Sequence, residues 1–307
     1  MPGGHTHQAA VARGPLAALR ALLSGRRLVA AAALTTALAG ALVWAWPTGP
    51  RGDVAHAVAV PTPPPHSAPG LSPEQIAGLP EAAYNQVIGG LIPVTSAAVT
   101  SVRVGALTAA APLYRTDGAR PVARMQAAGP FGDPNPIVVI ATSGAWDLVL
   151  TPARQALPSA SPNGWAPAQT AGWMPASYVH GLAEASARIT VHTGERTVVI
   201  SRHGAADQVF HVAVGAAKTP TPGGVTGYLE ARFVNSAGGT RSTRVQLTSL
   251  HTTTADDPAG GVSGGLIALH WWPQASGAVS HGCVRLSAPA LAAVDALPLG
   301  TPIVTTE

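Results

Sequence analysis

Ser280-His281-Gly282-Cys283-Val284-Arg285 is the stretch of this chain with the clearest chemical signal. Cys283 is the only cysteine, so it has no disulfide partner within the chain. A thiol attacks as its thiolate, and a nearby imidazole or guanidinium lowers its pKa. Both kinds of group are present, because a histidine and an arginine flank Cys283 and His270 lies upstream. The glycine before the cysteine lets backbone N–H groups approach a developing oxyanion. The stretch therefore predicts the active site of a cysteine acyl-transfer enzyme.

Composition limits the class of protein. The chain has 307 residues, enough for one to three domains. Only 10% of the residues are charged, while 34 glycines and 29 prolines favour turn-rich β structure and linkers over long amphipathic helices. The net charge is only +4, and no basic stripe interleaved with aromatic residues follows the first 27 residues. The sequence therefore argues against nucleic-acid binding.

An apolar run without a charge covers residues 28–46, after two arginines and with two tryptophans near its end. At about 1.5 Å per residue, a helix of this length nearly crosses a hydrocarbon core of about 30 Å. By the positive-inside rule we expect a cytoplasmic tail at 1–27, a transmembrane signal anchor at 28–46, and the remaining chain outside the membrane. Two alternatives stay open: a signal cleaved near Ala55-His56-Ala57, giving a secreted protein, and a buried Ala-rich helix.

An exported chain makes the lone cysteine informative. An oxidising compartment turns a spare exposed thiol into a liability, so a thiol kept there is a candidate nucleophile. The alternative is a buried and inert side chain, which is the commonest fate of a free cysteine. The histidine and glycine before Cys283 and the arginine after it favour the nucleophile.

The segments after the apolar run predict a linker and then short helices. Residues 47–70 are proline-rich without hydrophobic periodicity, which is typical of an extended spacer. Residues 71–98 are expected to hold one or two short helices, with Ser72 as N-cap and Pro73 at the first helical position.

Residues 99–182 are expected to form a small β module. The predicted strands are Val99–Leu107, Pro112–Tyr114, Ile137–Thr142 and Trp146–Leu150. Together with Gly172-Trp173-Met174-Pro175, the second and fourth of these segments resemble a small SH3-like barrel. We interpret Trp165, Trp173 and Tyr178 as core residues, with a ligand-binding platform as the alternative.

Residues 187–307 are denser in strand signals and long enough to bury a core of their own. A hairpin is predicted around the turn at residues 193–196, and the proline-rich stretch at 218–224 predicts a loop or a strand edge. The other elements expected are strands Val209–Val214, Tyr228–Val234, Leu266–His270 and Thr301–Thr305, and a short helix Leu291–Leu297.

Four sequence blocks in this region resemble the L,D-transpeptidase (YkuD) family. They are Thr219-Pro220-Thr221-Pro222-Gly223, Ile267-Ala268-Leu269-His270, Ser280-His281-Gly282-Cys283-Val284-Arg285-Leu286 and Gly300-Thr301-Pro302-Ile303-Val304. The resemblance implies a mainly β chain with a β-sandwich catalytic domain at 187–307, preceded by the SH3-like module and the N-terminal transmembrane helix.

The resemblance implies peptidoglycan stem peptides as partners. Cys283 would attack the carbonyl of the third residue of a stem tetrapeptide and expel D-alanine, leaving a thioester. The side-chain amine of a third residue on another stem would then take the acyl group, which gives a 3→3 cross-link. Covalent catalysis of this kind requires no cofactor and no metal. Carbapenem-type β-lactams are the expected inhibitors, acylating the same thiol.

The remaining site residues receive roles on the same basis. His270 is the predicted base, while His281 is expected to shape substrate or oxyanion contacts, and an exchange of these two roles stays open. Gly282 and Cys283 are the expected backbone donors to the oxyanion. Ser280 is expected to hydrogen-bond the loop. Arg285 is expected to orient the loop or to bind a substrate carboxylate, with a structural ion pair as the alternative.

Two features depart from the family pattern. Only nine residues separate His270 from Ser280, which predicts a short covering loop. Trp271 stands where the family often has glycine or serine, so the imidazole keeps an orienting partner only if that partner is a backbone carbonyl. Trp271 and Trp272 are expected to form a wall of the substrate groove. The remaining histidines lack metal-ligand spacing with the cysteine.

Two other functions remain possible at the level of sequence. One is an L,D-carboxypeptidase, in which water replaces the acceptor amine. The other is a non-catalytic cell-wall-binding protein, in which the SH3-like module binds and Cys283 is inert. The pairing of His270 with Cys283 in the sequence argues against the second.

Overall fold

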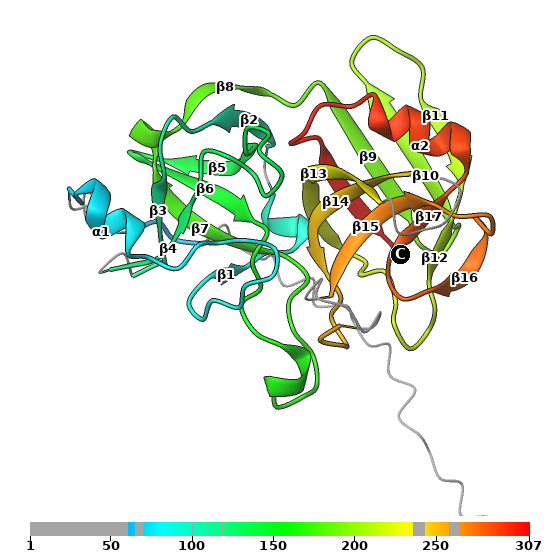
Figure 1. Cartoon of the computed structure of the whole chain (residues 1–307), viewed down its shortest axis with the longest axis horizontal. Helices are drawn as coiled ribbons and strands as arrows, with labels where there is room; N and C mark the ends of the chain where they lie inside the picture. Colours follow the sequence, from blue (N-terminus) through cyan, green and yellow to red (C-terminus); the bar gives the residue numbers. More distant parts are fainter. Residues whose placement is uncertain (1–60, 65–69, 100, 118–119, 236–242, 258–264) are drawn as a thin grey trace, which may run out of the picture. The chain divides into compact units, whose positions relative to one another are not determined.

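The computed structural model describes residues 61–64, 70–99, 101–117, 120–235, 243–257 and 265–307, all within one compact unit, Ala55–Glu307 (Figure 1). The predicted cytoplasmic tail at 1–27, the signal anchor at 28–46 and most of the linker at 47–70 lie outside these residues. In the part that is described, no helix is long and apolar enough to cross a membrane. The described fold is mainly β, as expected, with two sheets and few helices.

The segment at 71–98 begins with the short helix α1 (Pro73–Ala77). Ser72 caps it, because its hydroxyl accepts a hydrogen bond from the backbone N–H of Gln75 while the Gln75 side chain accepts one from the backbone of Ser72. This capping box and the proline in the first turn account for a helix start where the sequence predicts one. A 3-10 turn, η1 (Ser96–Ala98), ends the segment.

The first sheet contains eight strands in the order β4-β3-β7-β6-β5-β2-β8, with β1 beside β7. Its strands are β1 (Ile92–Pro93), β2 (Arg103–Ala106), β3 (Ala111–Tyr114), β4 (Pro121–Met125), β5 (Ile137–Ser143), β6 (Trp146–Thr151), β7 (Thr170–Pro175) and β8 (His180–Glu184). The likeness of this region to an SH3 barrel, and its status as a separate domain at 99–182, stay predictions.

Large aromatic side chains fill the core of the first sheet. Trp173 and Tyr114 are fully buried, and Tyr114 packs edge-on against Trp146 with ring centroids 5.2 Å apart. Burial of such side chains contributes about 1.5–3 kcal/mol each. Two of these tryptophans therefore act as core residues, whereas Trp165 is exposed.

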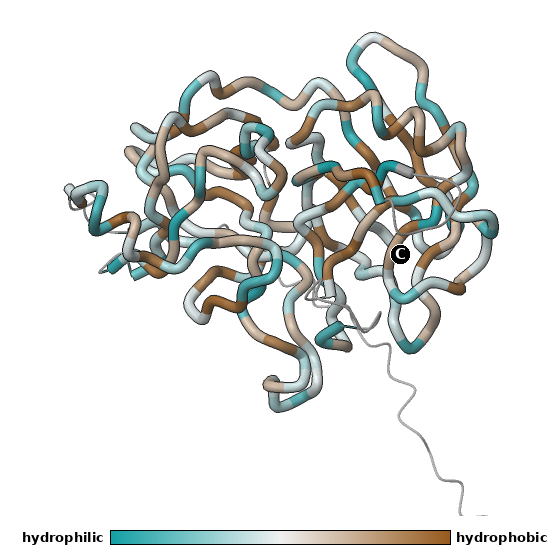
Figure 2. The backbone as a smooth tube through the Cα atoms, in the orientation of Figure 1, coloured by the Kyte–Doolittle hydropathy of each residue, from teal (hydrophilic) through white to brown (hydrophobic). Residues whose placement is uncertain are grey.

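The second sheet contains ten strands in the order β11-β10-β9-β18-β13-β14-β15-β17-β12-β16. They are β9 (Ala187–His192), β10 (Thr197–Arg202), β11 (Gln208–His211), β12 (Ala213–Gly215), β13 (Val225–Asn235), β14 (Thr243–His251), β15 (Leu266–Trp271), β16 (Gly277–Ser280), β17 (Val284–Leu286) and β18 (Pro302–Thr306). The predicted hairpin is present, with Thr197 paired to His192 across the turn. Figure 2 shows hydrophobic residues recurring along the strands.

Strand β13 joins the two halves of this sheet, here called its arms: one contains β11, β10, β9 and β18, and the other contains β14, β15, β17, β12 and β16. Its first part, from Val225 to Tyr228, pairs with β18, and its second part pairs with β14. The two arms share one hydrophobic core, in which Ile189 and Ile200 of one arm lie in the same cluster as Leu269 and Val284 of the other. The predicted sandwich therefore takes the form of a continuous sheet whose arms pack together through their inner faces.

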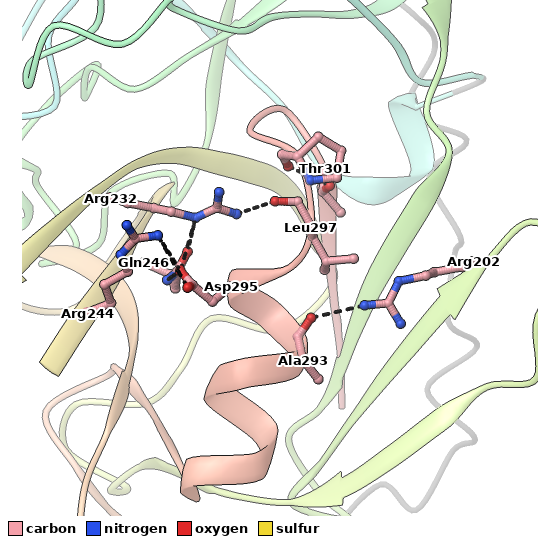
Figure 3. Close-up of polar contacts among 9 residues, drawn as sticks. Arg202, Arg232, Arg244, Gln246, Ala293, Asp295, Leu297 and Thr301 are labelled. Carbon is pink, nitrogen blue, oxygen red and sulfur yellow. Dashed lines mark hydrogen bonds and ion pairs between the residues drawn. The ribbon is translucent and has the colours of Figure 1, made fainter.

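Helix α2 (Ala288–Asp295) joins this core and is tied down by polar contacts at its C-terminal end (Figure 3). Arginine side chains of the two arms donate to the carbonyls of Ala293 and Leu297, which no later turn of helix could satisfy. Two side chains of β14 bind the carboxylate of Asp295. These contacts hold α2 against β10, β13 and β14.

A buried carboxyl group marks the point where β13 changes partners. Glu230 lies at the irregularity in the β13–β14 register between Leu229 and Ala231, as expected where a bulge redirects a side chain. It is 3% exposed, and its Oε2 has no hydrogen-bond partner among the described residues. Burial raises the pKa of Glu230 to about 8, so the carboxyl is mainly neutral at pH 7.

Replacing Glu230 with glutamine is expected to remove a pH dependence of stability. Because the folded-state pKa is raised from 4.5 to about 8, the carboxyl favours folding below pH 4.5, and this contribution is lost as pH rises through 8. The full loss is at most about 5 kcal/mol. Urea unfolding at pH 5, 7 and 9 measures it, with the exposed Glu184→Gln as control. Equal pH dependence in the wild type and Glu230→Gln would contradict the prediction.

Candidate active site

His281, Gly282 and Cys283 form the tight connection between β16 and β17. Strand β17 lies parallel to β15, with Leu269 opposite Val284 and His270 opposite Arg285. Leu269 and Val284 point into the shared core. Because side chains alternate along a strand, His270 and Arg285 lie on the opposite, outer face.

Cys283 immediately precedes β17 and lies on the same outer face. Its side chain packs against a cluster that includes Leu266 and Ala268 of β15 and Leu247 of β14, with Tyr84 beside it. Cys283 and His270 are therefore diagonal neighbours on adjacent strands. Diagonal neighbours on one face of a sheet lie within reach of long and aromatic side chains. The register thus places His270 and Cys283 on the same face of the sheet, while their catalytic pairing stays a prediction.

Gly282 is required by the shape of the turn. Its φ is +108°, in the left-handed region that glycine adopts without strain. A Cβ at this position would lie 2.9 Å from Cδ1 of Ile267 and 3.0 Å from Cγ2 of Thr252, so there is no room for a side chain. The hydroxyl of Thr221 donates to the Gly282 carbonyl at 2.7 Å, which ties the turn to the proline-rich loop.

Ser280 closes the turn from inside. Its hydroxyl donates to the carbonyl of Cys283 and accepts a hydrogen bond from the N–H of Gly282 at 3.2 Å. The Gly282 amide, one of the two expected oxyanion donors, is therefore already engaged. Among the described residues, no acceptor is found for the N–H of Cys283, which leaves that amide available as an oxyanion donor.

The surroundings of the thiol disfavour its ionised form. Burial raises the pKa of Cys283, and this outweighs the opposite effects of the Ala268 amide and the Arg285 guanidinium. The N–H of Ala268 donates to Sγ at 3.4 Å, while Sγ lies 4.0 Å from the carbonyl oxygen of Leu266. Neighbouring groups therefore do act on the thiol in the predicted direction, but they do not by themselves produce a thiolate, so deprotonation requires a base.

His270 is held as a neutral imidazole. Its Nδ1 lies 3.0 Å from the carbonyl oxygen of Trp271, and since a carbonyl only accepts, Nδ1 carries the proton. Nε2 is then free to accept a proton. Burial, with a smaller contribution from the Arg285 charge, lowers the pKa of His270 despite this hydrogen bond. The orienting partner is thus a backbone carbonyl, which tryptophan at 271 supplies as well as glycine would.

Trp272 links the histidine to the arginine. The His270 ring meets the indole edge-on with centroids 5.9 Å apart, and the guanidinium carbon of Arg285 lies 4.9 Å from the centre of the same indole. The backbone N–H of Trp272 donates to the carbonyl of Leu286. In the described part of the chain, Arg285 takes part in no ion pair, so its charge stays available to a ligand.

Some residues were placed by sequence reasoning and others were missed. His281 is exposed in the turn, and the described residues give it no contact with Cys283 or His270. Ala268 and Thr252 act through a backbone amide and a methyl group, and residues of this kind leave no signal in a single sequence. Thr221 belongs to a recognised block, but the partner of its hydroxyl could not be read from spacing. The described residues hold no group of three or more side chains suited to a metal ion.

Comparisons with known proteins find one family model and several solved structures. Residues 186–305 match the model of the YkuD family, described as the L,D-transpeptidase catalytic domain. No curated protein matches the chain. An L,D-transpeptidase structure from Mycobacterium smegmatis is 18% identical, over 56% of this chain and 91% of that chain, with a TM-score of 0.31.

Two structures from Mycobacterium tuberculosis are similar to the same extent. One L,D-transpeptidase from strain H37Rv is 16% identical, over 56% of this chain and 90% of that chain, with a TM-score of 0.33. L,D-transpeptidase 3, in complex with a faropenem-derived adduct, is 16% identical over 56% and 91%, with a TM-score of 0.30. The C-terminal part of this chain, residues 186–305, therefore matches the YkuD family of L,D-transpeptidase catalytic domains.

Proposed function

We propose that this protein cross-links peptidoglycan by L,D-transpeptidation, with Cys283 as nucleophile and His270 as base. The observation that carries the proposal is the placement of a half-buried thiol and a backbone-oriented imidazole on one face of two adjacent strands. The match of residues 186–305 to the L,D-transpeptidase family supplies the reaction class.

The first half of the reaction forms a thioester. Nε2 of His270 takes the thiol proton as the sulfur attacks the carbonyl of the third residue of a donor stem. The N–H of Cys283 donates to the oxyanion that forms, a contribution of about 3 kcal/mol per donor. The carbon–nitrogen bond then breaks, and D-alanine leaves with the proton from His270.

The second half transfers the acyl group. The side-chain amine of the third residue of an acceptor stem attacks the thioester, giving its proton to His270. The carbon–sulfur bond breaks, the thiolate recovers the proton from His270, and a 3→3 amide cross-link is released. The bond energy is conserved in the thioester, so no nucleotide is consumed.

Substrate contacts are assigned to the residues around the imidazole. Arg285, which has no acidic partner among the described residues, is proposed to bind a stem carboxylate while Trp272 supports its guanidinium from below. Trp271 and Trp272 are proposed as one wall of the groove. Residues 28–46 are proposed as the membrane anchor that keeps this site outside the cell, with secretion after signal cleavage as the alternative.

The proposed function is tested by product analysis. The full chain is incubated with a disaccharide-tetrapeptide, and the products are resolved by mass spectrometry. Cross-linked dimer with release of D-alanine is the expected result. Tripeptide alone would replace the proposal by L,D-carboxypeptidase activity, in which water attacks the thioester. Absence of any turnover would contradict the enzymatic function and leave wall binding.

A further inference from the structure

Arg154 is a buried arginine that connects the two sheets. It follows β6 in the first sheet and is only 1% exposed. Its guanidinium donates to the carbonyl oxygens of Thr252 at 2.5 Å, Asp256 at 2.8 Å and Ala255 at 3.2 Å. All three acceptors belong to the short segment that follows β14 in the second sheet. One side chain thus fixes the backbone of this segment at three points.

The connection between β6 and β7 makes further hydrogen bonds to the same segment. The N–H and the hydroxyl of Ser159 both donate to the carboxylate of Asp256, at 3.0 and 2.5 Å. The N–H of Ala166 donates to the carbonyl of Thr253 at 3.0 Å. Residues that follow β6 in the first sheet therefore hydrogen-bond to Thr252, Thr253, Ala255 and Asp256 in the segment after β14.

Thr252 connects this segment to the turn at residues 281–283. Its hydroxyl donates to the carbonyl of Ala255 at 2.6 Å, which fixes the rotamer of the side chain. Its methyl group then lies against Gly282, only 3.0 Å from the place where a Cβ would stand. A shift of the segment would therefore change the packing of the residue immediately before Cys283.

The guanidinium of Arg154 also lies next to Gly265, the residue before β15. The N–H of Thr252 donates to the carbonyl of Gly265 at 2.9 Å. A Cβ on Gly265 would lie 3.0 Å from Nη1 of Arg154, so the two are in close contact. Strand β15 begins at the next residue and carries Ala268, whose amide meets the sulfur, and His270.

The chemistry of the site explains why an arginine stands there. A buried guanidinium is costly unless its donors are hydrogen-bonded, and three backbone carbonyls accept from the Nη atoms of Arg154. A lysine offers one compact charge and cannot reproduce the planar fork. An apolar residue would leave buried carbonyls without donors.

We propose that Arg154 is a positioning residue of the active site, which, through residues 252–256, sets the turn at Gly282 and the start of β15 and so aligns Cys283 with His270. The first sheet then has a role in catalysis that requires no ligand of its own. The kinetic part of this inference rests on the proposed function, whereas its geometric part does not.

The test compares Arg154→Met and Arg154→Lys with a matched control. Arg124→Met removes an arginine that also binds backbone carbonyls, but those of Ala77 and Leu79, at and just after the end of α1. Thermal unfolding establishes that each variant is folded at the assay temperature. Because Cys283 is the only cysteine, alkylation by iodoacetamide across pH reports on this thiol alone. Acylation by a carbapenem reports on the assembled site.

For Arg154→Met we expect acylation to slow roughly 10- to 100-fold, since a displacement of about 1 Å at a reacting group has effects of this size. The alkylation midpoint is expected to move to higher pH, because the sulfur loses the Ala268 amide. Arg154→Lys should recover part of the acylation rate and part of the shift in the alkylation midpoint. Arg124→Met should have the wild-type acylation rate and alkylation midpoint. A folded Arg154→Met with the wild-type rate and pH profile would overturn the proposal.

If Arg154→Met does not fold, the variant Thr252→Ser tests the proposal instead. Thr252→Ser keeps the hydroxyl that binds Ala255 but removes the methyl that touches Gly282, so it should slow acylation while remaining folded. Wild-type acylation by Thr252→Ser would count against the proposal in that case. Should the wild type fail to turn over stem peptide, the alkylation profiles still test the positioning role, which separates this failure from a failure of the proposed function.

Discussion

Replacing Cys283 with serine is expected to abolish both stem-peptide turnover and the mass adduct with a carbapenem. Serine fits the same turn, but a hydroxyl is a much weaker nucleophile than a thiol. The imidazole of His270 can deprotonate a thiol far more readily than a hydroxyl. By analogy with hydrolases that have lost a nucleophile, the rate should fall on the order of 10⁴-fold or more. Intact-protein mass spectrometry after carbapenem treatment measures the adduct.

The control for this change introduces serine at a neighbouring exposed position. Val279→Ser lies on β16 with its side chain in solvent, so it should form the adduct at the wild-type rate. Unfolding by urea should show that both variants are folded. An adduct that persists in Cys283→Ser would place the nucleophile elsewhere and would remove the mechanism proposed above.

Replacing His270 with glutamine is expected to lower the acylation rate about 10²- to 10⁴-fold, the usual contribution of a general base. The matched variant is His281→Gln, which changes the exposed histidine of the turn. We expect it to stay within about tenfold of wild type, because the described residues give His281 no contact with the thiol. A larger loss in His281→Gln than in His270→Gln would exchange the two roles.

The pH profile distinguishes a base from a merely structural histidine. With the pKa of His270 lowered and that of Cys283 raised, wild-type acylation should rise with pH through a midpoint below the ordinary histidine pKa of about 6.5 and then level off. In His270→Gln this acidic limb should vanish, and the rate should climb only as the thiol itself ionises, above about pH 8.5. An unchanged profile would contradict the base assignment.

Much of the site could be predicted because its key groups lie close together in the sequence. Cys283 and Gly282 carry their constraints in residue type alone, namely a lone thiol and a residue without Cβ. His270 was predicted through family resemblance, and the register of β15 against β17 gives the physical reason for the pairing. The carbonyl of Trp271 could be named only as a condition, because backbone groups are the same at every residue.

The fold was predictable where local signals were strong and not where pairing supplies the stability. The capped helix α1 and the hairpin β9–β10 follow from residues adjacent in the chain. Strand β14 was missed because Gln246, Thr248 and Ser249 interrupt the apolar pattern; they are buried polar residues whose partners come from elsewhere in the fold. The position of Arg154 was likewise unpredictable, since its acceptors are about a hundred residues away in sequence.

The place of β18 has a consequence for how the domain is made. Strand β9 ends at His192, yet its parallel neighbour β18 starts only at Pro302 and separates it from β13. During synthesis the hairpin of β9 and β10 must therefore wait, with one edge open, until the rest of the domain has emerged. Such long-range pairing slows folding and prolongs exposure of strand edges to aggregation. We expect the thiol to acquire its environment late, which delays reactivity until the domain is complete.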